Sequence, residues 1–76
     1  MTLETIKKEL GKFEKESNKK VEINNITTDL QTNADIIDIN INGEKTIFFV
    51  VEKNNYAINL KNGKWSTTFE KLLKLC

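Results

Sequence analysis

The sequence predicts a small α+β domain in which two helices flank an antiparallel sheet of three or four strands. Residues 2–17 show a helical apolar repeat, residues 34–52 alternate around an Asn-Gly turn, and residues 67–76 show a second helical repeat. Because each helix would have one apolar stripe, we expect a two-layer sandwich: the strands form a meander, and both helices pack on one of its faces. A chain of 76 residues suffices for one domain, residues 1–76, with a small core.

The first helix is expected from Thr2 to about Ser17. Its apolar residues recur at spacings of three and four, which places them on one side; they are Leu3, Ile6, Leu10 and Phe13. Thr2 is suited to cap the N-terminus, because its hydroxyl can accept a hydrogen bond from a free backbone N–H group.

A first strand is expected from Lys20 to Asn24. Val21 and Ile23 face one way, but the alternation then changes phase, since Ile26 falls on the opposite parity. A bulge or kink would return the later apolar side chains to the same face.

The clearest hairpin covers residues 34–52 and turns at Asn42 and Gly43. A two-residue loop would pair Ile39 with Thr46 and mix polar with apolar residues on both faces. A three-residue loop, with Gly43 left-handed and followed by a bulge, shifts the pairing by one residue. We therefore expect the three-residue loop, which assembles a core face from Ile37, Ile39, Ile41, Ile47, Phe49 and Val51.

The end of the chain predicts a fourth strand and the second helix. The strand would continue the same core face with Tyr56, Ile58 and Leu60. Thr67 and Glu70 fit a capping box, with Thr67 as the N-cap. The helix that follows carries an apolar stripe of Phe69, Leu72, Leu73 and Cys76.

Composition argues against an enzyme. The chain has no arginine and no histidine, the side chain whose ordinary pKa lies closest to neutral pH. Its only cysteine, Cys76, has no histidine to serve as its base. The abundance of lysine, isoleucine and asparagine is also typical of an AT-rich genome, which is a second explanation for the missing arginine. We expect no enzymatic activity, no cofactor and no small-molecule substrate.

The acidic residues could suggest a metal site, but their spacing does not match an EF-hand loop. The acids in question are Asp29, Asp35, Asp38 and Glu44. Asp38 alternates with isoleucines, which places it on the solvent face of a strand. We expect a solvated acidic sheet face and no metal site.

The apolar runs are too short for a membrane segment. The longest, residues 47–51, is far shorter than a bilayer span, and the first residues lack the apolar stretch of a signal peptide. We therefore expect a cytoplasmic protein that does not enter a membrane.

A binding surface is expected on the sheet face that the helices leave open. In the favoured register, Ile36, Phe48, Val50 and Ala57 point away from the helices, beside Asp38. An apolar patch with a polar rim is typical of a protein–protein interface, so the partner would be another protein or a second copy of the chain. The expected contact residues are Ile36, Asp38, Phe48 and Val50.

A nucleic-acid interface is the alternative prediction. Residues 53–76 contain five lysines and one glutamate, and lysines interleaved with aromatic residues can bind single strands. The residues for this alternative are Lys61, Lys64, Trp65, Lys71 and Lys74. Residues 22–52 contain six acids and one lysine, which argues against nucleic-acid binding by the whole chain.

In size and AT-rich style, the chain resembles the small inhibitors that phages and mobile elements carry, such as anti-CRISPR proteins. This resemblance is one of format, and no single motif carries it. It implies a protein that acts by occupying the surface of its partner.

Overall fold

The computed structural model describes all residues, 1–76, and contains two helices and five strands. The helices are α1 (Leu3–Ser17) and α2 (Phe69–Leu73). The strands are β1 (Val21–Asp29), β2 (Ala34–Ile41), β3 (Glu44–Val51), β4 (Tyr56–Asn59) and β5 (Trp65–Ser66), with a 3-10 turn, η1 (Glu52–Asn54), between β3 and β4. The expected α+β class is confirmed, and the sheet has one strand more than the upper expectation. Neither helix has the length and apolarity needed to span a membrane.

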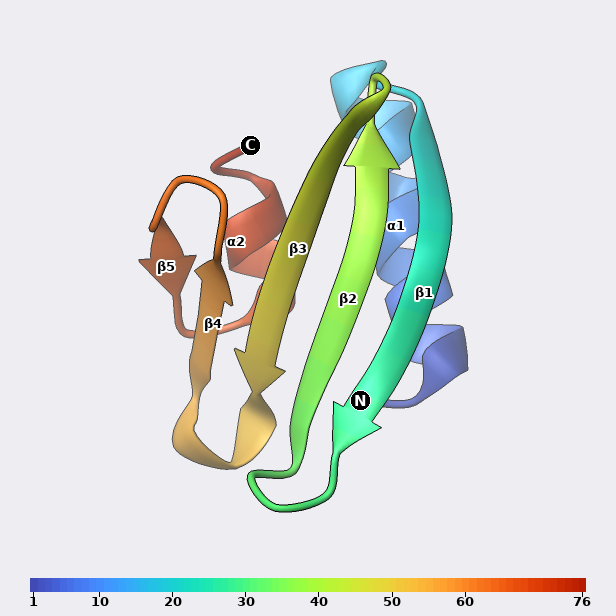
Figure 1. Cartoon of the computed structure of the whole chain (residues 1–76). Coiled ribbons are helices and arrows are strands. Elements are labelled where there is room, and N and C mark those ends of the chain that lie inside the picture. Colours follow the sequence, from blue (N-terminus) through green and yellow to red (C-terminus); the bar gives the residue numbers. More distant parts are fainter.

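The strands form one antiparallel sheet in the order β1-β2-β3-β4-β5, so every strand pairs with its neighbours in sequence (Figure 1). The fifth strand was not expected. It has only two residues, Trp65 and Ser66, which is too short to show an alternating pattern.

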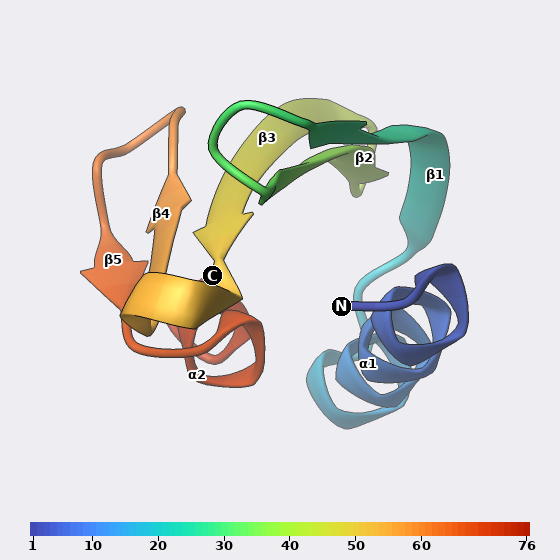
Figure 2. The same cartoon turned by 90° about the horizontal axis from the view of Figure 1, so that it is seen from below.

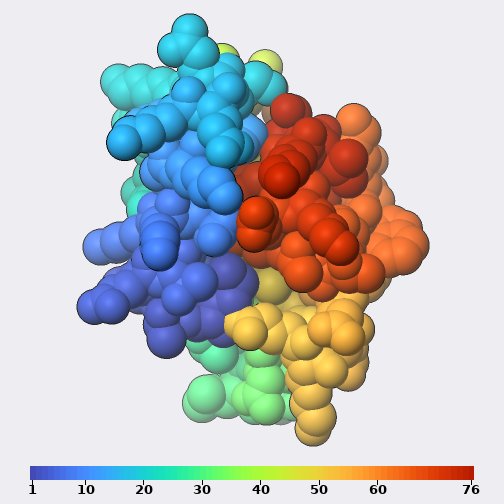
Figure 3. Space-filling model, turned by 180° about the vertical axis from the view of Figure 1, so that it is seen from behind, coloured from blue at the N-terminus to red at the C-terminus, as the bar shows by residue number.

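Both helices lie on the concave side of the curved sheet, α1 behind β1 and β2 and α2 behind β3 and β4 (Figures 1 and 2). Figure 3 shows the two helices side by side on that side of the molecule. We name this side of the sheet the inner face and the opposite side the outer face. The core between helices and inner face consists of Ile6, Leu10, Phe13, Ile37, Ile39, Phe48, Val50, Ala57, Phe69, Leu72 and Leu73. Phe48 and Phe69 meet edge to face, with ring centroids 5.3 Å apart.

The two helix N-termini are capped by threonines. The Oγ1 atom of Thr2 accepts a hydrogen bond from the backbone N–H of Thr5 at 3.2 Å, which confirms the expected cap of α1. The cap of α2 is Thr68 and not Thr67, and its hydroxyl accepts from the N–H of Lys71 at 3.1 Å. The prediction failed by one residue because Thr68 itself keeps an extended backbone and α2 begins at Phe69.

The expected bulge in β1 is confirmed. The pairing of β1 with β2 shifts between Ile23 and Asn25, so Asn24 is an extra residue without a partner. This shift returns Ile26 to the inner face, opposite Ile37. A strand that the sequence predicted to end near Asn24 therefore continues to Asp29.

The predicted three-residue loop between β2 and β3 is wrong. Asn42 and Gly43 alone connect the strands, with φ angles of 51° and 82°, and Ile41 pairs with Glu44. Two consecutive positive φ angles define the turn type that Asn-Gly favours and that matches the twist of a hairpin. The mixed pairing that this register creates is tolerated, because the buried hydroxyl of Thr46 donates to the carbonyl of Glu44 at 3.4 Å.

This register exchanges the predicted faces of β3 and β4. Phe48, Val50 and Ala57, expected to face solvent, lie on the inner face and are buried in the core. Ile47, Phe49 and Ile58, expected in the core, lie on the outer face. Val51 is also expected on the core face. It is buried, although the alternation along β3 puts it on the outer side with Phe49. The change follows directly from the turn, because a shift of one residue moves every side chain of a strand to the other face.

Candidate functional site: the outer face of the sheet

A row of paired residues crosses the whole outer face. Ile36 on β2 pairs with Phe49 on β3, Phe49 pairs with Ile58 on β4, and Ile58 pairs with Trp65 on β5. On the other side, Ile36 pairs with Thr27 on β1. We name Ile36, Phe49, Ile58 and Trp65 the outer row. Figure 1 looks onto this face, and no other segment of the chain covers it.

The end of the outer row at β4 and β5 is aromatic and open to solvent. Trp65 is 58% exposed, and its ring stacks on Tyr56 with centroids 5.8 Å apart. Next to the row, the N–H of Leu60 donates to the carbonyl of Ile47 at 2.9 Å, and Leu60 is also exposed. Apolar residues thus extend from β3 to β5 on this face.

Apart from Ile36, the part of the outer face over β1 and β2 is polar. The amide of Asn24, the extra residue of the bulge, donates to the Oδ1 atoms of Asp38 and Asn40 at 3.2 and 2.9 Å. Asp38 is also 3.7 Å from the Nζ atom of Lys45 on β3. The outer face therefore has an apolar half and a polar half.

Charge changes sign across the sheet. Residues 21–41, which contain β1 and β2, carry four acids and no lysine, whereas residues 53–66, which contain β4 and β5, carry three lysines and no acid. Strand β3 between them has one charge of each sign, Glu44 and Lys45. Of the four acids, Asp35 faces the core side. Of the three lysines, Lys61 and Lys64 point to the inner side, where their Nζ atoms contact Glu44 and the carbonyl of Leu75. We name Glu22, Asp29 and Asp38 the acidic flank of the outer row.

Two of the four contact residues expected from the sequence are corrected by the structure. Phe48 is fully buried and Val50 is 2% exposed, so neither can contact a partner. Ile36 and Asp38 do lie on the outer face, where they are partly exposed. The apolar residues of the outer face that the sequence analysis missed are Phe49 and Ile58, and the strong preference of Asn-Gly for a two-residue turn was the signal that could have identified them.

The residues of the nucleic-acid alternative do not form one surface. The Nζ atom of Lys61 is 2.5 Å from Glu44, and that of Lys64 donates to the carbonyl of Leu75 at 3.3 Å. Lys71 and Lys74 lie on the exposed side of α2, which faces away from the sheet, whereas Trp65 lies on the outer face.

A charged group is buried on the inner face. The carboxylate of Asp35, 5% exposed, accepts from the Met1 ammonium group and from the hydroxyl of Thr28, both at 3.1 Å. The Met1 ammonium also pairs with Glu52. The hydrogen bond with Glu52, and then that with Asp35, raise the pKa of the Met1 amino group above its ordinary value, and these gains outweigh the opposing effect of burial.

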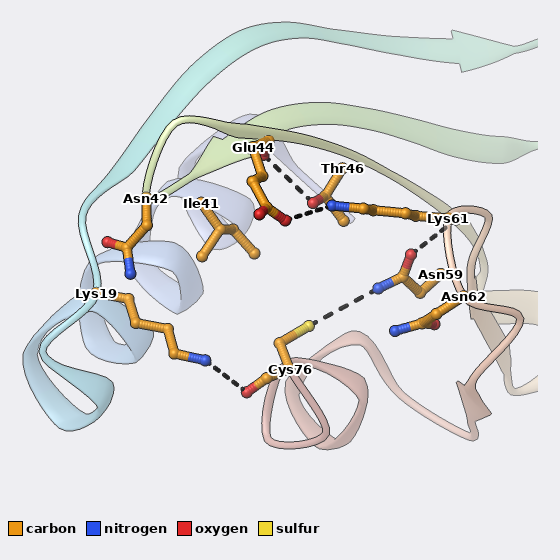
Figure 4. A pocket seen from close by; sticks show the side chains of 9 residues that line it. All are labelled: Lys19, Ile41, Asn42, Glu44, Thr46, Asn59, Lys61, Asn62 and Cys76. Carbon is orange, nitrogen blue, oxygen red and sulfur yellow. Dashed lines mark hydrogen bonds and ion pairs between the residues drawn. The ribbon is translucent and has the colours of Figure 1, made fainter.

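A polar cavity of about 410 Å³ opens at the end of the inner face, beside the β2–β3 turn (Figure 4). It is lined by Lys19, Ile41, Asn42, Glu44, Thr46, Asn59, Lys61, Asn62 and Cys76. The buried amide of Asn59 accepts from the N–H of Lys61 at 2.9 Å and donates to the Sγ atom of Cys76 at 3.9 Å. The Nζ atom of Lys19 donates to the carbonyl of Cys76 at 3.0 Å.

The ionisable groups of this cavity are engaged with one another. The ammonium group of Lys61 lowers the pKa of Glu44, which therefore stays ionised. Burial raises the pKa of the Cys76 thiol and outweighs the opposing effects of Lys19 and Asn59, so the sulfur stays protonated at neutral pH. The cavity holds no nucleophile paired with a base.

Comparison of the chain with models of protein families, with characterised proteins and with solved structures finds no match.

Proposed function

We propose that this chain is a protein-binding module and that the outer face is its contact surface. The observation that carries the proposal is the outer row, Ile36, Phe49, Ile58 and Trp65, on the face that both helices leave open. Aromatic and aliphatic side chains surrounded by polar groups are the usual centre of a protein interface.

Shape and charge describe the surface that such a partner would present. The outer face is convex across the strands (Figure 2), so it fits a concave surface better than a flat one. The acidic flank on one side of the outer row would favour a partner with basic groups opposite it, because opposite charges across an interface favour one alignment over the others. By occupying a concave surface, the module would inhibit a partner whose activity needs that surface.

The remaining features favour binding over catalysis or nucleic-acid recognition. In the polar cavity beside the β2–β3 turn, Glu44 is paired with Lys61 and the Cys76 thiol is protonated. The lysines expected to contact phosphates are divided between α2 and the loops around β5, and two of them, Lys61 and Lys74, lie within 4 Å of a glutamate.

The proposal can be tested by photo-crosslinking in the native host. A photoreactive phenylalanine analogue would replace Phe49 on the outer face, and the control would carry it at Lys15, on the exposed side of α1. We expect a protein adduct from position 49 and not from position 15. The absence of any protein adduct at position 49 contradicts the proposal.

The nucleic-acid alternative makes a different prediction in the same experiment. It requires an adduct that nuclease treatment shortens and that weakens steeply with salt, because binding through several lysines releases counterions. Contact through the apolar outer row should respond weakly to salt.

A further inference from the structure

We propose that the polar cavity beside the β2–β3 turn binds a small molecule through an oxyanion, a phosphate or carboxylate group. This inference goes beyond the proposed function, because the cavity opens on the inner face and is lined by no residue of the outer row. Its volume of about 410 Å³ falls within the range of small-molecule sites in proteins. All of its lining residues except Ile41 and Cys76 are polar or charged.

Three asparagine amides of the cavity have a fixed orientation. The Oδ1 atoms of Asn42, Asn59 and Asn62 each accept a hydrogen bond from a backbone N–H group, at 2.9, 2.9 and 3.0 Å. Because a backbone N–H group needs an acceptor, exchanging the oxygen and nitrogen of any of these amides would break its bond. The NH₂ group is therefore the part of each amide that remains for a ligand.

These NH₂ groups have little to bond within the chain. Asn59 is 3% exposed, and its Nδ2 atom meets only the Sγ atom of Cys76, at 3.9 Å. The amide nitrogens of Asn59 and Asn62 both point into the cavity (Figure 4). The turns themselves need only the acceptor oxygen, which an aspartate would supply equally well. The donors are thus available for a group outside the chain.

The charged groups of the cavity favour an anion. Its lining contains two lysines, Lys19 and Lys61, and one acid, Glu44, which leaves one excess positive charge. Glu44 is already paired with Lys61, and the Nζ atom of Lys19 donates to a backbone carbonyl, that of Cys76. Walls that offer amide and ammonium donors are satisfied by a ligand with several acceptor oxygens and a negative charge. Phosphate and carboxylate groups have both properties.

The bare anion should bind weakly. The cavity is larger than one phosphate or carboxylate group, and the ammonium group of Lys61 is shared with Glu44. We expect dissociation constants of roughly millimolar for inorganic phosphate or acetate. A larger molecule that carries the same group would fill more of the cavity and bind more tightly.

The first test is a titration of the ¹⁵N-labelled chain with sodium phosphate and, separately, with sodium acetate, followed by NMR. Sodium chloride keeps the ionic strength constant. We expect saturable shifts of the NH₂ signals of Asn59 and Asn62, and the anion that binds more tightly identifies the ligand as a phosphate or a carboxylate. The NH₂ signal of Asn24, which donates to Asp38 and Asn40 on the outer face, is the internal control. The absence of saturable shifts with both anions overturns the proposal.

The second test removes one donor. Asn59→Asp keeps an acceptor for the N–H of Lys61 but has no NH₂ group, so it should weaken binding of the anion by at least about tenfold. The matched control is Asn54→Asp, which makes the same change in η1 at the other end of β3 and should leave the affinity unchanged. If Asn59→Asp does not fold, as judged by circular dichroism, Asn62→Asp makes the same exchange at an exposed residue. Equal weakening in the control would show a general effect of charge and overturn the proposal.

The third test should increase the affinity. Glu44→Gln removes the only acid of the lining and frees the ammonium group of Lys61, so the anion should bind several-fold more tightly. The matched control is Glu4→Gln in the first turn of α1, which changes the net charge equally and should have no effect. Damage to the fold would not produce a gain of affinity confined to Glu44→Gln. An affinity that this variant leaves unchanged or lowers would overturn the proposed site.

Discussion

Phe48 and Phe49 are neighbours in the chain, yet they belong to surfaces with different roles. The ring of Phe48 is enclosed by the helices and contacts Phe69, whereas Phe49 lies among apolar neighbours on a face that nothing in the chain covers. Both side chains follow from the same alternation along β3. The comparison shows that an apolar strand can have two apolar faces, and that only the elements packed on one of them distinguish core from surface.

The largest difference between the two faces should appear in stability. We expect Phe48→Ala to lower the free energy of unfolding by about 3–5 kcal/mol, because it leaves a cavity under both helices. Phe49→Ala should cost about 1 kcal/mol or less, since partly exposed positions tolerate truncation. Urea unfolding followed by circular dichroism measures both. Equal losses would show that the outer face contributes to the fold as much as the core does.

A smaller effect is expected at the turn that sets the two faces. Asn42 has a φ of 51°, and its Oδ1 atom accepts from the N–H of Lys20 at 2.9 Å. Asn42→Ala should lower the free energy of unfolding by about 1–2 kcal/mol, because alanine is strained in the left-handed region and cannot accept this bond. The matched control is Asn54→Ala in η1, at a residue without a positive φ, which should change stability little. A similar loss in both variants would contradict this account of the turn.

The smallest effect concerns the Met1 ammonium group, which pairs with the buried carboxylate of Asp35 on the inner face. The folded protein binds the Met1 proton more tightly than the unfolded chain, because the pKa of this amino group is raised above 8.0. The resulting stability is complete below pH 8.0 and is lost as the pH rises through the higher pKa of the folded state. Stability measured by urea unfolding should therefore decrease with pH in this alkaline range.

The cysteine requires a control in this measurement. The pKa of the Cys76 thiol is also raised in the folded state, so its ionisation lowers stability in the same direction. Measurements in a Cys76→Ser background remove this contribution. In that background, Glu52→Gln and Asp35→Asn should each flatten the pH dependence, and an unchanged slope would exclude Met1 as its origin.

The elements that depend on local patterns could be predicted from the sequence. The stripe of α1 and its Thr2 cap are read from residues three and four apart. The bulge at Asn24 follows from the change of parity between Ile23 and Ile26. The β2–β3 hairpin follows from Asn-Gly between apolar runs.

The faces of β3 could not be derived from alternation alone. After Thr46, the residues of β3 as far as Val51 are apolar on both faces of the strand. Either register therefore gives an apolar core face. A three-residue loop is predicted because it gives a uniformly apolar inner face. In the structure, the turn has two residues and Thr46 is buried on that face. The candidate site is the sheet face opposite the core. This one error in the hairpin register therefore placed Phe48, instead of Phe49, in the predicted contact surface.

The position of Trp65 gives the protein its own optical reporter. It is the only tryptophan of the chain, it is largely exposed at the end of the outer row, and it takes no part in the core. Its fluorescence should therefore have a long emission wavelength in the free folded protein and change little in wavelength on unfolding. A shift to shorter wavelength would instead accompany coverage of this end of the sheet, so that a titration with any candidate partner can be followed without a label.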